Sequence, residues 1–481
     1  MISEELECDL LVVGGGPAGL AAGALAARYG VGTLLVDERV TLGGQIHKQP
    51  GPGFVIDTPH HLGRDFERGV KLIEDARAAG VQFLLNSSVV AIRDFTAVVH
   101  THGASVMTTI RAKRLLICPG AHDRPVAFPG WTLPGVITAG GAQSLFKTSR
   151  VSVGDRVAFA GSGPVALAFP AQLRHYGVNV VLALEAGPAP SLRSVLGMLK
   201  TGRGNASLLY DGVRYRGQLL RARVPLRYRR IIVRAEGVDH VEAVVHAAVD
   251  REWRVLAGTE ERVEVDTICL GYGFVPSSEL FRLLECRFGY DEDLGGAVVV
   301  LDEWGQTTVP GVFGAGDGTG VRGSLVATAQ GCLAALRVAT DIGSVDATEA
   351  ESLARTLRRQ LTQKEEFRRT LRSMFAVGPG IFELASADTV ICRCEEVSRQ
   401  RLDEAIRASD DLNTVKSYTR AGMGLCQGRN CMRHIQSMIA AAKGTTIDTV
   451  GMSTQRPPVR HVPLSALADE SIRDRGLFTR E

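Results

Sequence analysis

Four cysteines in the last quarter of the chain have the spacing of metal ligands. Cys392 and Cys394 form a C-x-C pair, and a C-x4-C pair, Cys426 and Cys431, follows after 31 intervening residues. Two close pairs of thiolates can bind a zinc ion or a [2Fe–2S] cluster. Because the pairs in zinc sites are usually separated by about two to four residues, the C-x-C pair favours the cluster. The sequence therefore predicts that these four cysteines hold a [2Fe–2S] cluster.

The surroundings of the cysteines support the same interpretation. Glycines at positions 422, 424 and 428 would let the backbone curl around inorganic sulfide and donate N–H groups to it. The other five cysteines are scattered, mostly in apolar stretches, and we expect them to be small buried side chains. They are Cys8, Cys118, Cys269, Cys286 and Cys332.

A glycine-rich turn near the N-terminus has the spacing of a dinucleotide-binding site. An apolar run at residues 9–13 leads into it, an Ala/Leu-rich stretch follows it, and a second apolar run occupies residues 33–36. This order predicts a βαβ unit in which the N–H groups at the start of the helix face a pyrophosphate. An acid at the end of the second run should accept hydrogen bonds from ribose, and counting from Gly14 favours Asp37, with Glu38 next to it. The glycines of the turn are Gly14, Gly16 and Gly19.

A second copy of this pattern begins at residue 157. Gly161, Gly163 and Ala166 form its turn, and Glu185 ends the following apolar run. Glu185 would accept hydrogen bonds from a ribose 2′-hydroxyl and repel a 2′-phosphate, so NAD is favoured over NADP. Pro170 falls inside the expected helix, where it would kink or shorten it. The sequence leaves open whether this site binds NAD, another adenine nucleotide or nothing.

Residues 309–318 (VPGVFGAGDG) form a third motif, with a helix expected over 324–339. This motif resembles the second FAD-binding segment of the two-dinucleotide-domain flavoproteins, which include glutathione reductase and thioredoxin reductase. Segments 115–125 and 267–276 resemble the crossings between the two domains of that family. The resemblance covers about residues 8–340 and implies FAD, with Asp317 binding its ribitol. The implied FAD-binding residues are Gly14, Gly16, Pro17, Ala18, Gly19, Asp37, Glu38, Gly43, Gly44, Gln45, Val89, Pro119, Gly120, Gly316, Asp317 and Leu325.

The redox-active cysteine pair of the disulfide reductases is missing. Residues 42–50 (LGGQIHKQP), where glutathione-reductase relatives place one, contain no cysteine, and the chain has no C-x-x-C. Disulfide reductase activity is therefore excluded. We expect His47, Lys48 and His122 to make surface or subunit contacts, and the sequence identifies no catalytic residue.

The cysteine segment resembles the [2Fe–2S] domain of bacterioferritin-associated ferredoxin, with Glu395 and Glu396 after the C-x-C pair. Its longer C-x4-C spacing looks like the variant fused to the large subunits of opine oxidases, D-hydroxyproline dehydrogenase and hydrogen cyanide synthase. The resemblance implies an oxidoreductase subunit that acts on CH–NH donors. A β flavoprotein subunit of the glycine-oxidase type would oxidise the substrate, and electrons would pass through the cluster to FAD and on to a quinone- or dye-type acceptor. A small third subunit would fit the same assembly.

Three alternative functions remain open. The chain could be a stand-alone NADH-dependent flavin reductase that uses the Gly161 turn. It could be the large subunit of a cyanide-forming glycine dehydrogenase, with the same cofactors and a different substrate. It could also be a nucleotide-binding scaffold whose cluster is only structural.

Composition places the chain among ordinary globular proteins. Its 481 residues are 45% hydrophobic and 22% charged, and the formal net charge of +3 gives no case for nucleic acid as a partner. No apolar run reaches the roughly 18–20 residues of a membrane span, and no signal peptide is evident, so we expect no transmembrane segment and a cytoplasmic protein with room for peripheral contact at the inner membrane.

The predicted fold class is α/β, with two nested Rossmann-like domains of the glutathione-reductase type and a small α-rich [2Fe–2S] domain. The first domain is discontinuous and binds FAD, and the second is NAD-like. A charged helical connector leads to the cluster domain, and an extended arm follows it. The predicted boundaries are 1–120 with 290–345, 121–289, 346–385, 386–445 and 446–481.

Overall fold

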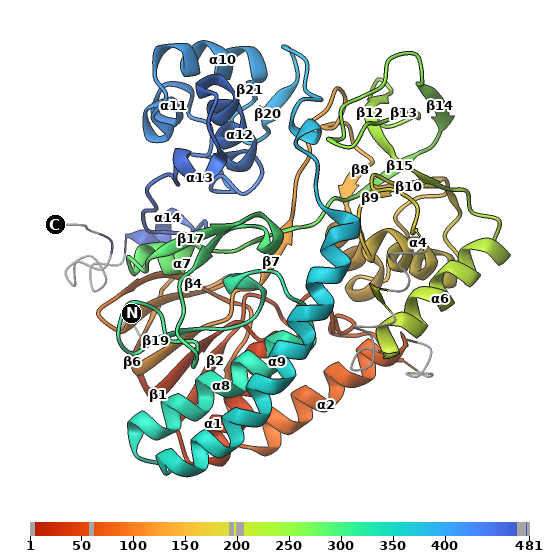
Figure 1. The fold of residues 1–481 in the computed structure, drawn as a ribbon. Coiled ribbons are helices and arrows are strands. Elements are labelled where there is room, and N and C mark those ends of the chain that lie inside the picture. Colours follow the sequence, from red (N-terminus) through yellow and green to blue (C-terminus); the bar gives the residue numbers. More distant parts are fainter. Residues whose placement is uncertain (1–4, 57–61, 192–196, 199–205, 469–477, 479–481) are drawn as a thin grey trace. The chain divides into compact units, whose positions relative to one another are not determined.

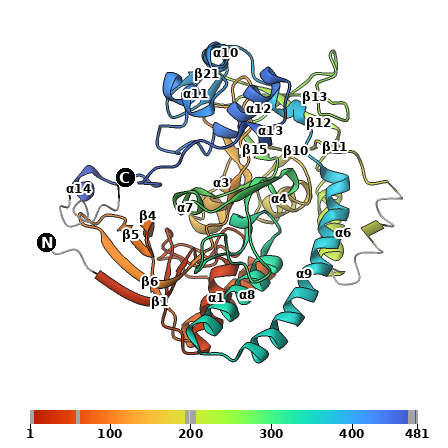
Figure 2. The same cartoon turned by 60° about the vertical axis from the view of Figure 1, so that its left-hand side comes forward.

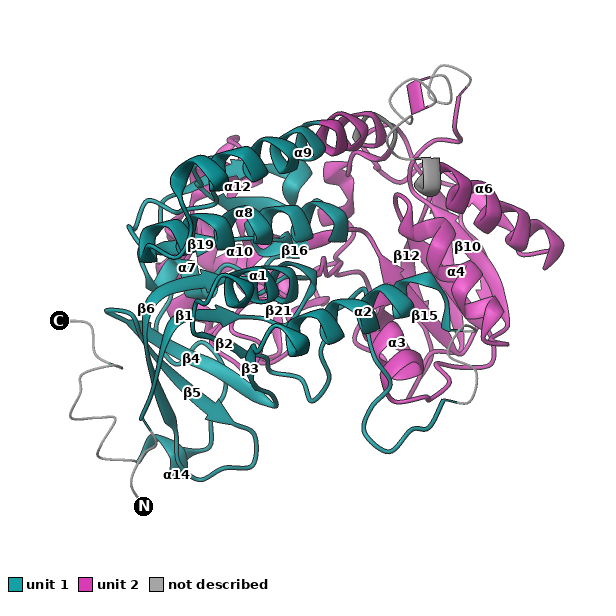
Figure 3. Cartoon of the chain, turned by 90° about the horizontal axis from the view of Figure 1, so that it is seen from below, with its two compact units in different colours: residues 1–121, 275–362, 454–481 teal, residues 122–274, 363–453 magenta. Residues whose placement is uncertain are grey.

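The computed structural model describes the whole chain except residues 1–4, 57–61, 192–196, 199–205, 469–477 and 479–481 (Figure 1; Figure 2 gives a second view). It divides into two compact units (Figure 3). Unit 1 contains residues 1–121, 275–362 and 454–481, and unit 2 contains residues 122–274 and 363–453.

Unit 1 is built on a seven-stranded sheet in the order β3-β2-β1-β6-β5-β4, with β19 also paired to β6. Its first four strands and β19 run parallel, and β4 and β5 are antiparallel. Both faces of the central strands are buried, which is why their sequences are continuous runs of apolar residues. The strands are β1 (Glu5–Val13), β2 (Thr33–Val36), β3 (Gln82–Leu84), β4 (Ser87–Arg93), β5 (Thr96–Thr101), β6 (Thr108–Ile117) and β19 (Val312–Gly314).

Helices cover the sheet of unit 1. The small residues of α1 (Pro17–Arg28) let α8 (Ser324–Ile342) pack closely beside it, and both views show the two helices side by side (Figures 1 and 2). Helix α2 (Arg64–Ala78) also packs on α1. The remaining elements assigned to this unit are α7 (Glu279–Leu283), β17 (Phe288–Asp291), η4 (Glu292–Leu294), β18 (Gly296–Val299), η5 (Asp317–Thr319) and α14 (Leu464–Leu467).

Helix α8 is a longer apolar run than the sequence suggested. Among the described residues it is long and apolar enough to cross a membrane, although the sequence had suggested no such run. More than half of its most apolar stretch is buried in the protein, and its inner face belongs to the core that it shares with α1. The core helix of a globular unit passes the same test of length and composition, so α8 is weak evidence for a span.

Unit 2 contains a parallel sheet in the order β11-β10-β9-β15-β8 and an antiparallel sheet in the order β12-β13-β14. The parallel strands are β8 (Val136–Thr138), β9 (Val157–Gly161), β10 (Val180–Glu185), β11 (Leu226–Tyr228) and β15 (Thr267–Gly271), with helices α3 (Ala139–Gln143), η2 (Ser144–Thr148), α4 (Val165–His175) and α6 (Ala206–Arg221). The antiparallel strands are β12 (Arg230–Glu236), β13 (Ala243–Ala248) and β14 (Glu261–Glu264). Strands β7 (Ala121–Asp123) and β16 (Phe274–Pro276) lie where the chain passes between the units.

The cysteine segment folds as a group of short elements in unit 2. They are η6 (Pro379–Phe382), β20 (Val390–Cys392), β21 (Val397–Ser398), α10 (Arg399–Ala408), α11 (Leu412–Thr419), α12 (Met432–Lys443) and α13 (Ile447–Val450). Helix α9 (Ala347–Phe375) precedes them as one continuous helix that contributes residues to both units (Figure 3).

These findings confirm the α/β fold class, with two nucleotide-type sheets and an α-rich C-terminal region. The compact units differ in detail from the predicted segments. Unit 1 resumes at residue 275, before the predicted 290, because Leu280, Phe281 and Cys286 pack in its core. The predicted arm is divided, since residues 446–453 belong to unit 2 and 454–481 to unit 1, and its residues 469–477 and 479–481 lie outside the described part.

One buried histidine in unit 2 gives a pH prediction. His246 lies in β13, and burial, followed by the Arg230 guanidinium beside it, lowers its pKa from 6.5 to about 4; Arg227 acts in the same direction and Glu261 in the opposite one. The Nη1 of Arg230 lies 3.0 Å from the Nδ1 of His246. Below pH 6.5 the unfolded chain binds a proton that the folded chain refuses until about pH 4. The free energy of unfolding should therefore fall as the pH drops through this window.

Urea unfolding followed across this pH range checks the expectation. In His246→Gln, that part of the pH dependence should disappear, while the other groups keep theirs. If the free energy of unfolding had the same pH dependence in the wild type and the variant, the lowered pKa of His246 would be contradicted.

Candidate cofactor sites

The predicted pyrophosphate turn connects β1 to α1 in unit 1. Gly14 has φ of +109°, and a Cβ added there would collide with the carbonyl oxygen of Cys118 at the end of β6. A Cβ on Gly19 would collide with the carbonyl oxygen of Gly14. Glycine is therefore required at both positions for β1, β6 and α1 to approach one another this closely.

The start of α1 is open for an anion. Gly16 is the N-cap residue, Pro17 occupies the first turn, and neither a side-chain cap nor an acidic residue is found there. Of the described atoms, the nearest to a Cβ on Gly16 would be the Cα of Gly44, at 3.8 Å. The N–H groups of the first helical turn are therefore left for a ligand, and a phosphate fits both their polarity and the helix dipole.

Asp37 and Glu38 follow β2 and differ in burial and in hydrogen bonding. Asp37 is buried, its Oδ2 accepts a hydrogen bond from the N–H of Gly15 at 2.6 Å, and its Oδ1 accepts one from Arg39 at 2.8 Å. Burial raises its pKa, and these two hydrogen bonds oppose the rise. Asp37 thus fixes the glycine turn against β2, while each of its oxygens has a further lone pair for ribose. Glu38 is exposed and lies 3.4 Å from the Nε of Arg460.

The loop at residues 43–45 lies against the same turn. The N–H of Gly43 donates to the carbonyl of Gly15 at 2.9 Å, and Gln45 next in the loop is exposed. His47 and Lys48 are buried, so the expectation of a surface contact is wrong for both. The Nδ1–H of His47 donates to the carbonyl of Asp65 at 2.7 Å, which gives this ring a structural role at the start of α2. His122 is partly exposed.

The crossing at Pro119 and Gly120 and the loop at Gly316 and Asp317 complete the FAD-type cradle. A Cβ on Gly318 would lie 2.6 Å from the Cδ of Pro119, and one on Gly316 would lie 3.1 Å from the Cβ of Ala18, so these loops meet at the start of α1.

Asp317 orders the approach to α8. Its Oδ1 accepts hydrogen bonds from the N–H groups of Arg322 and Gly323, both at 2.9 Å. Leu325 is exposed in the first turn of α8, and Val89 is buried in β4. Sequence reasoning missed Gln330 of α8, whose Oε1 accepts from the N–H of Gly316 at 3.1 Å. The structure therefore gathers the predicted FAD residues around one turn and two helix starts in unit 1, and the residues present fit an extended dinucleotide.

The second turn, in unit 2, has the same construction with differences. Glu185 is buried; its Oε2 accepts from the N–H of Gly163 at 3.0 Å and its Oε1 from the N–H of Gly187 at 2.8 Å. Burial raises its pKa to about 7 against the effect of these hydrogen bonds. Helix α4 begins at Val165, after Pro164, and continues through Pro170 to His175, so the proline does not end it. A Cβ on Gly163 would lie 3.9 Å from the Cβ of Phe375, whereas Gly16 faces no side chain of the described residues this closely.

The third residue of this turn is small for a packing reason. Ala166 is buried in the first turn of α4, and a Cβ on Gly161 would collide with the carbonyl oxygen of Gly271 on β15. The turn is therefore as compact as the one in unit 1. For this turn, NAD, another adenine nucleotide and no ligand all stay open.

The four predicted cluster cysteines come together as two pairs. The thiol of Cys392 interacts most strongly with that of Cys431, and the thiol of Cys394 with that of Cys426. The interaction with Cys431 lowers the pKa of Cys392 to about 6, and the same contact raises that of Cys431. Cys392 and Cys431 are buried, and Cys394 is exposed.

These pairs have a consequence for the type of metal centre. Across the described residues, no group of three or more His, Cys, Asp or Glu side chains has the geometry to hold a metal ion. A zinc site would need all four thiolates around one ion, whereas a [2Fe–2S] cluster has two irons and four thiolate ligands. A Cβ on Gly424 would collide with the Cβ of Cys394, so glycine lets the second loop close over the first. The donor set of four thiols fits a [2Fe–2S] cluster.

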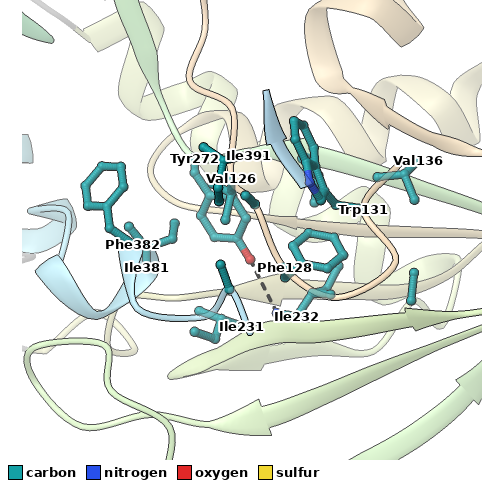
Figure 4. Packing of buried hydrophobic residues seen from close by; sticks show 14 of the residues in the cluster. Val126, Phe128, Trp131, Val136, Ile231, Ile232, Tyr272, Ile381, Phe382 and Ile391 are labelled. Carbon is teal, nitrogen blue, oxygen red and sulfur yellow. Dashed lines mark hydrogen bonds between the residues drawn. The ribbon is translucent and has the colours of Figure 1, made fainter. Parts of the chain in front are cut away.

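The cysteine segment shares a hydrophobic core with the second nucleotide domain (Figure 4). Ile391, Cys392 and Cys431 pack in the same hydrophobic core as Phe128 and Tyr272. Hydrogen bonds join the two parts. The indole Nε1 of Trp131 donates to the carbonyl of Val390 at 2.6 Å, and the N–H of Ala127 donates to the Nε2 of His434 at 3.1 Å. The segment with the four cysteines therefore packs against the second nucleotide domain within unit 2.

Comparisons with known proteins extend this geometry. Residues 8–332 match the family described as pyridine nucleotide-disulphide oxidoreductase, and residues 387–470 match the sarcosine oxidase A3 domain. The chain is 34% identical to hydrogen cyanide synthase subunit HcnB of Pseudomonas aeruginosa, over 95% of this chain and 97% of that protein. It is 33% identical to an opine oxidase subunit of Rhizobium meliloti, over 96% of this chain and 98% of that protein.

A solved structure shows the same fold. It is the L-proline dehydrogenase from P. horikoshii, which aligns with a TM-score of 0.67 over 97% of this chain and 81% of that one. The sequence identity is 20%, so the likeness concerns the fold alone.

Proposed function

Because the chain belongs to the pyridine nucleotide-disulphide oxidoreductase family and is similar over nearly its whole length to HcnB and the opine oxidase subunit, we propose that it is the electron-transfer subunit of a hetero-oligomeric amine or amino-acid dehydrogenase, of the opine or D-hydroxyproline type. It would contain FAD and a [2Fe–2S] cluster. The observation that carries the proposal is that the two family matches include both nucleotide turns and all four cysteines, while the similarity to HcnB and to the opine oxidase subunit covers at least 95% of the chain.

The residues assign a place to each cofactor. The turn at Gly14–Gly19, the loop at 43–45 and the helix starts of α1 and α8 would hold FAD, and the two thiol pairs would hold the cluster. When bound, FAD accepts or releases two electrons and the cluster one, so the two together can connect a two-electron oxidation to a one-electron carrier. The chain's own residues bind and orient these groups.

Substrate oxidation would take place on a partner. The Nδ1–H of His47, the histidine that follows the flavin loop, donates to the carbonyl of Asp65, and this bond fixes the orientation of the ring. A β flavoprotein subunit of the glycine-oxidase type would oxidise the C–N bond, with a small third subunit in the same complex and a quinone- or dye-type acceptor. The expected location is the cytoplasm, with peripheral contact at the inner membrane.

The proposal departs from the chemistry that the family's description names. Cys118 is the cysteine beside the Gly14 turn, and burial raises its pKa to about 12, so it would remain a thiol. Since residues 42–50 contain no cysteine, a disulfide exchange pair is missing where it would be needed.

A second candidate function is the large subunit of a cyanide-forming glycine dehydrogenase. It has equal support in similarity, since the identities to HcnB and to the opine oxidase subunit are 34% and 33%. Both candidates assign the same cofactors to the same residues of this chain, and they differ in the substrate of the partner.

Anaerobic reduction tests the proposal. The chain should be purified alone and with the polypeptide encoded beside it, and then mixed with an opine, D-hydroxyproline or glycine. We expect the flavin and cluster absorbance to bleach only when the partner is present. Oxidation of the amine at full rate by the chain alone would refute the relay, and cyanide release from glycine would select the second candidate.

The same samples distinguish the remaining alternatives. Bleaching of the isolated chain by NADH would indicate a reductase that uses the Gly161 turn. A cluster that stays oxidised while substrate and partner turn over would indicate a structural cluster on a nucleotide-binding scaffold.

A further inference from the structure

Residues 454–468, the C-terminal segment, lie on the sheet of unit 1. Val459 is fully buried in the core formed by β1, β2 and β4, and its N–H donates to the carbonyl of Val90 at 2.8 Å. The pairing of β4 with β5 shifts register between Val89 and Ala91, so Val90 is the extra residue of a β-bulge. The extra residue of a bulge is left out of the strand ladder, and Val459 gives its carbonyl a donor.

A second anchor follows seven residues later. Ala466 in α14 is fully buried with Val90, Ala91, Val98 and Met107. The C-terminal segment is thus fixed to β4 and β5 at two points, although the sequence suggested only an extended arm. Its buried side chains are used within unit 1.

Between the two anchors, Arg460 reaches the nucleotide site. Its Nε lies 3.4 Å from the Oε2 of Glu38, and its side chain is only 20% exposed. Glu38 follows the acid at the end of β2, and the N–H of Ser87 at the start of β4 donates to the carbonyl of Asp37 at 2.9 Å. The end of β2 is therefore adjacent to the start of β4, and the C-terminal segment passes along both places.

This position borders the ribose end of the FAD site. In open α/β sheets a dinucleotide binds beyond the carboxyl ends of the strands, with its ribose at the acid after the second strand. Two predicted FAD residues lie at this segment. Glu38 is within ion-pair distance of Arg460, and Val89 is next to Val90, whose carbonyl accepts the hydrogen bond from Val459. A segment fixed here would lie beside an adenosine bound at Asp37 and Glu38 and would restrict its exit.

We propose that the C-terminal segment closes the adenosine end of the FAD site and slows the release of FAD, with Arg460 as a positioning residue that holds Glu38. The proposal rests on the assignment of FAD to the Gly14 turn. It gives the segment a role inside this chain.

The test measures FAD release from the full chain after dilution, followed by the rise in flavin fluorescence. Arg460→Ala should release FAD about 1.5- to 5-fold faster, the range of a partly exposed ion pair. Arg460→Glu should be faster still, because it places two carboxylates together, and Arg460→Lys should stay near the wild type. The matched control is Arg456→Ala, an exposed arginine of the same segment, which should leave the release rate unchanged.

A second variant acts at the other anchor. Ala466→Asp places a charge in the buried cluster with Val98 and Met107, and it should accelerate release without touching Glu38. Circular dichroism and iron content identify a chain that has failed to fold. Release rates equal to the wild type in both Arg460→Glu and Ala466→Asp would overturn the proposal. Failure of the FAD assignment looks different, because the wild-type chain would then contain no flavin to release.

Discussion

A Gly19→Ala chain is expected to fold and to be purified without FAD. The added methyl group would collide with the carbonyl oxygen of Gly14 and lie 3.1 Å from the Cγ1 of Val12. Because the obstacle at Gly14 is backbone, no side-chain rotation relieves it, and α1 must move away from β1. Overpacking of this kind costs about 1–3 kcal/mol or more, and the movement takes the N–H groups of the first helical turn away from the pyrophosphate.

The measurement is the ratio of flavin to protein after gel filtration, together with the dissociation constant of added FAD. We expect the affinity to fall by about 10- to 100-fold, which corresponds to roughly 1.4–2.8 kcal/mol. Gly23→Ala is the control on the same helix, since its methyl group would meet Val81 at an ordinary 3.4 Å. If Gly19→Ala bound FAD as tightly as the wild type, the Gly14 turn would not be the phosphate site.

A Cys426→Ser chain is expected to lose its iron. The cluster needs two thiolate pairs, and this change leaves Cys394 without its partner. Cys426 is partly exposed, so serine at this position does not disturb the core. Iron and sulfide content should fall from about two per chain to near zero, and the electron paramagnetic resonance signal of the reduced cluster should vanish.

The other pair should add a loss of stability. Cys431 is fully buried in the core that contains Val126 and Phe128, so Cys431→Ser would place a hydroxyl there as well as remove the cluster. We expect a lower melting temperature of unit 2 for Cys431→Ser than for Cys426→Ser. Cys332→Ser on α8 is the control and should keep both the iron and the stability. A wild-type chain that contains one zinc ion and no iron would refute the cluster.

Sequence alone predicted the parts of the site that depend on local spacing. The βαβ order around Gly14 follows from a short apolar strand, a turn that only glycine fits and a helix of small residues, and the structure places β2 at the expected residues 33–36. The partition of the cysteines could not be predicted, because Cys392 pairs with Cys431 and Cys394 with Cys426 across a loop and two helices. Spacing predicts which residues are ligands, and the tertiary fold decides which thiols meet.

The features that sequence missed depend on long-range packing. His47 was expected at the surface because a polar pair follows a glycine loop, but the carbonyl of Asp65 satisfies its ring in the interior. The C-terminal segment lacks the periodicity of a helix or a strand, so nothing local indicates that Val459 supplies a donor to Val90. Likewise, the shared core of the cysteine segment depends on Trp131 and Phe128, which are distant in sequence.

The path of the chain between the units also sets an order of biosynthesis. Residues 454–468 leave the ribosome after the glycine turn, the second nucleotide turn and all four cluster cysteines. Unit 1 begins to fold first, yet it receives its last strand-bound segment only when the whole of unit 2 has been translated. Under the proposed closure, a nascent chain would bind FAD early and would retain it firmly only once residues 454–468 have been translated, which is after Cys426 and Cys431 have been made.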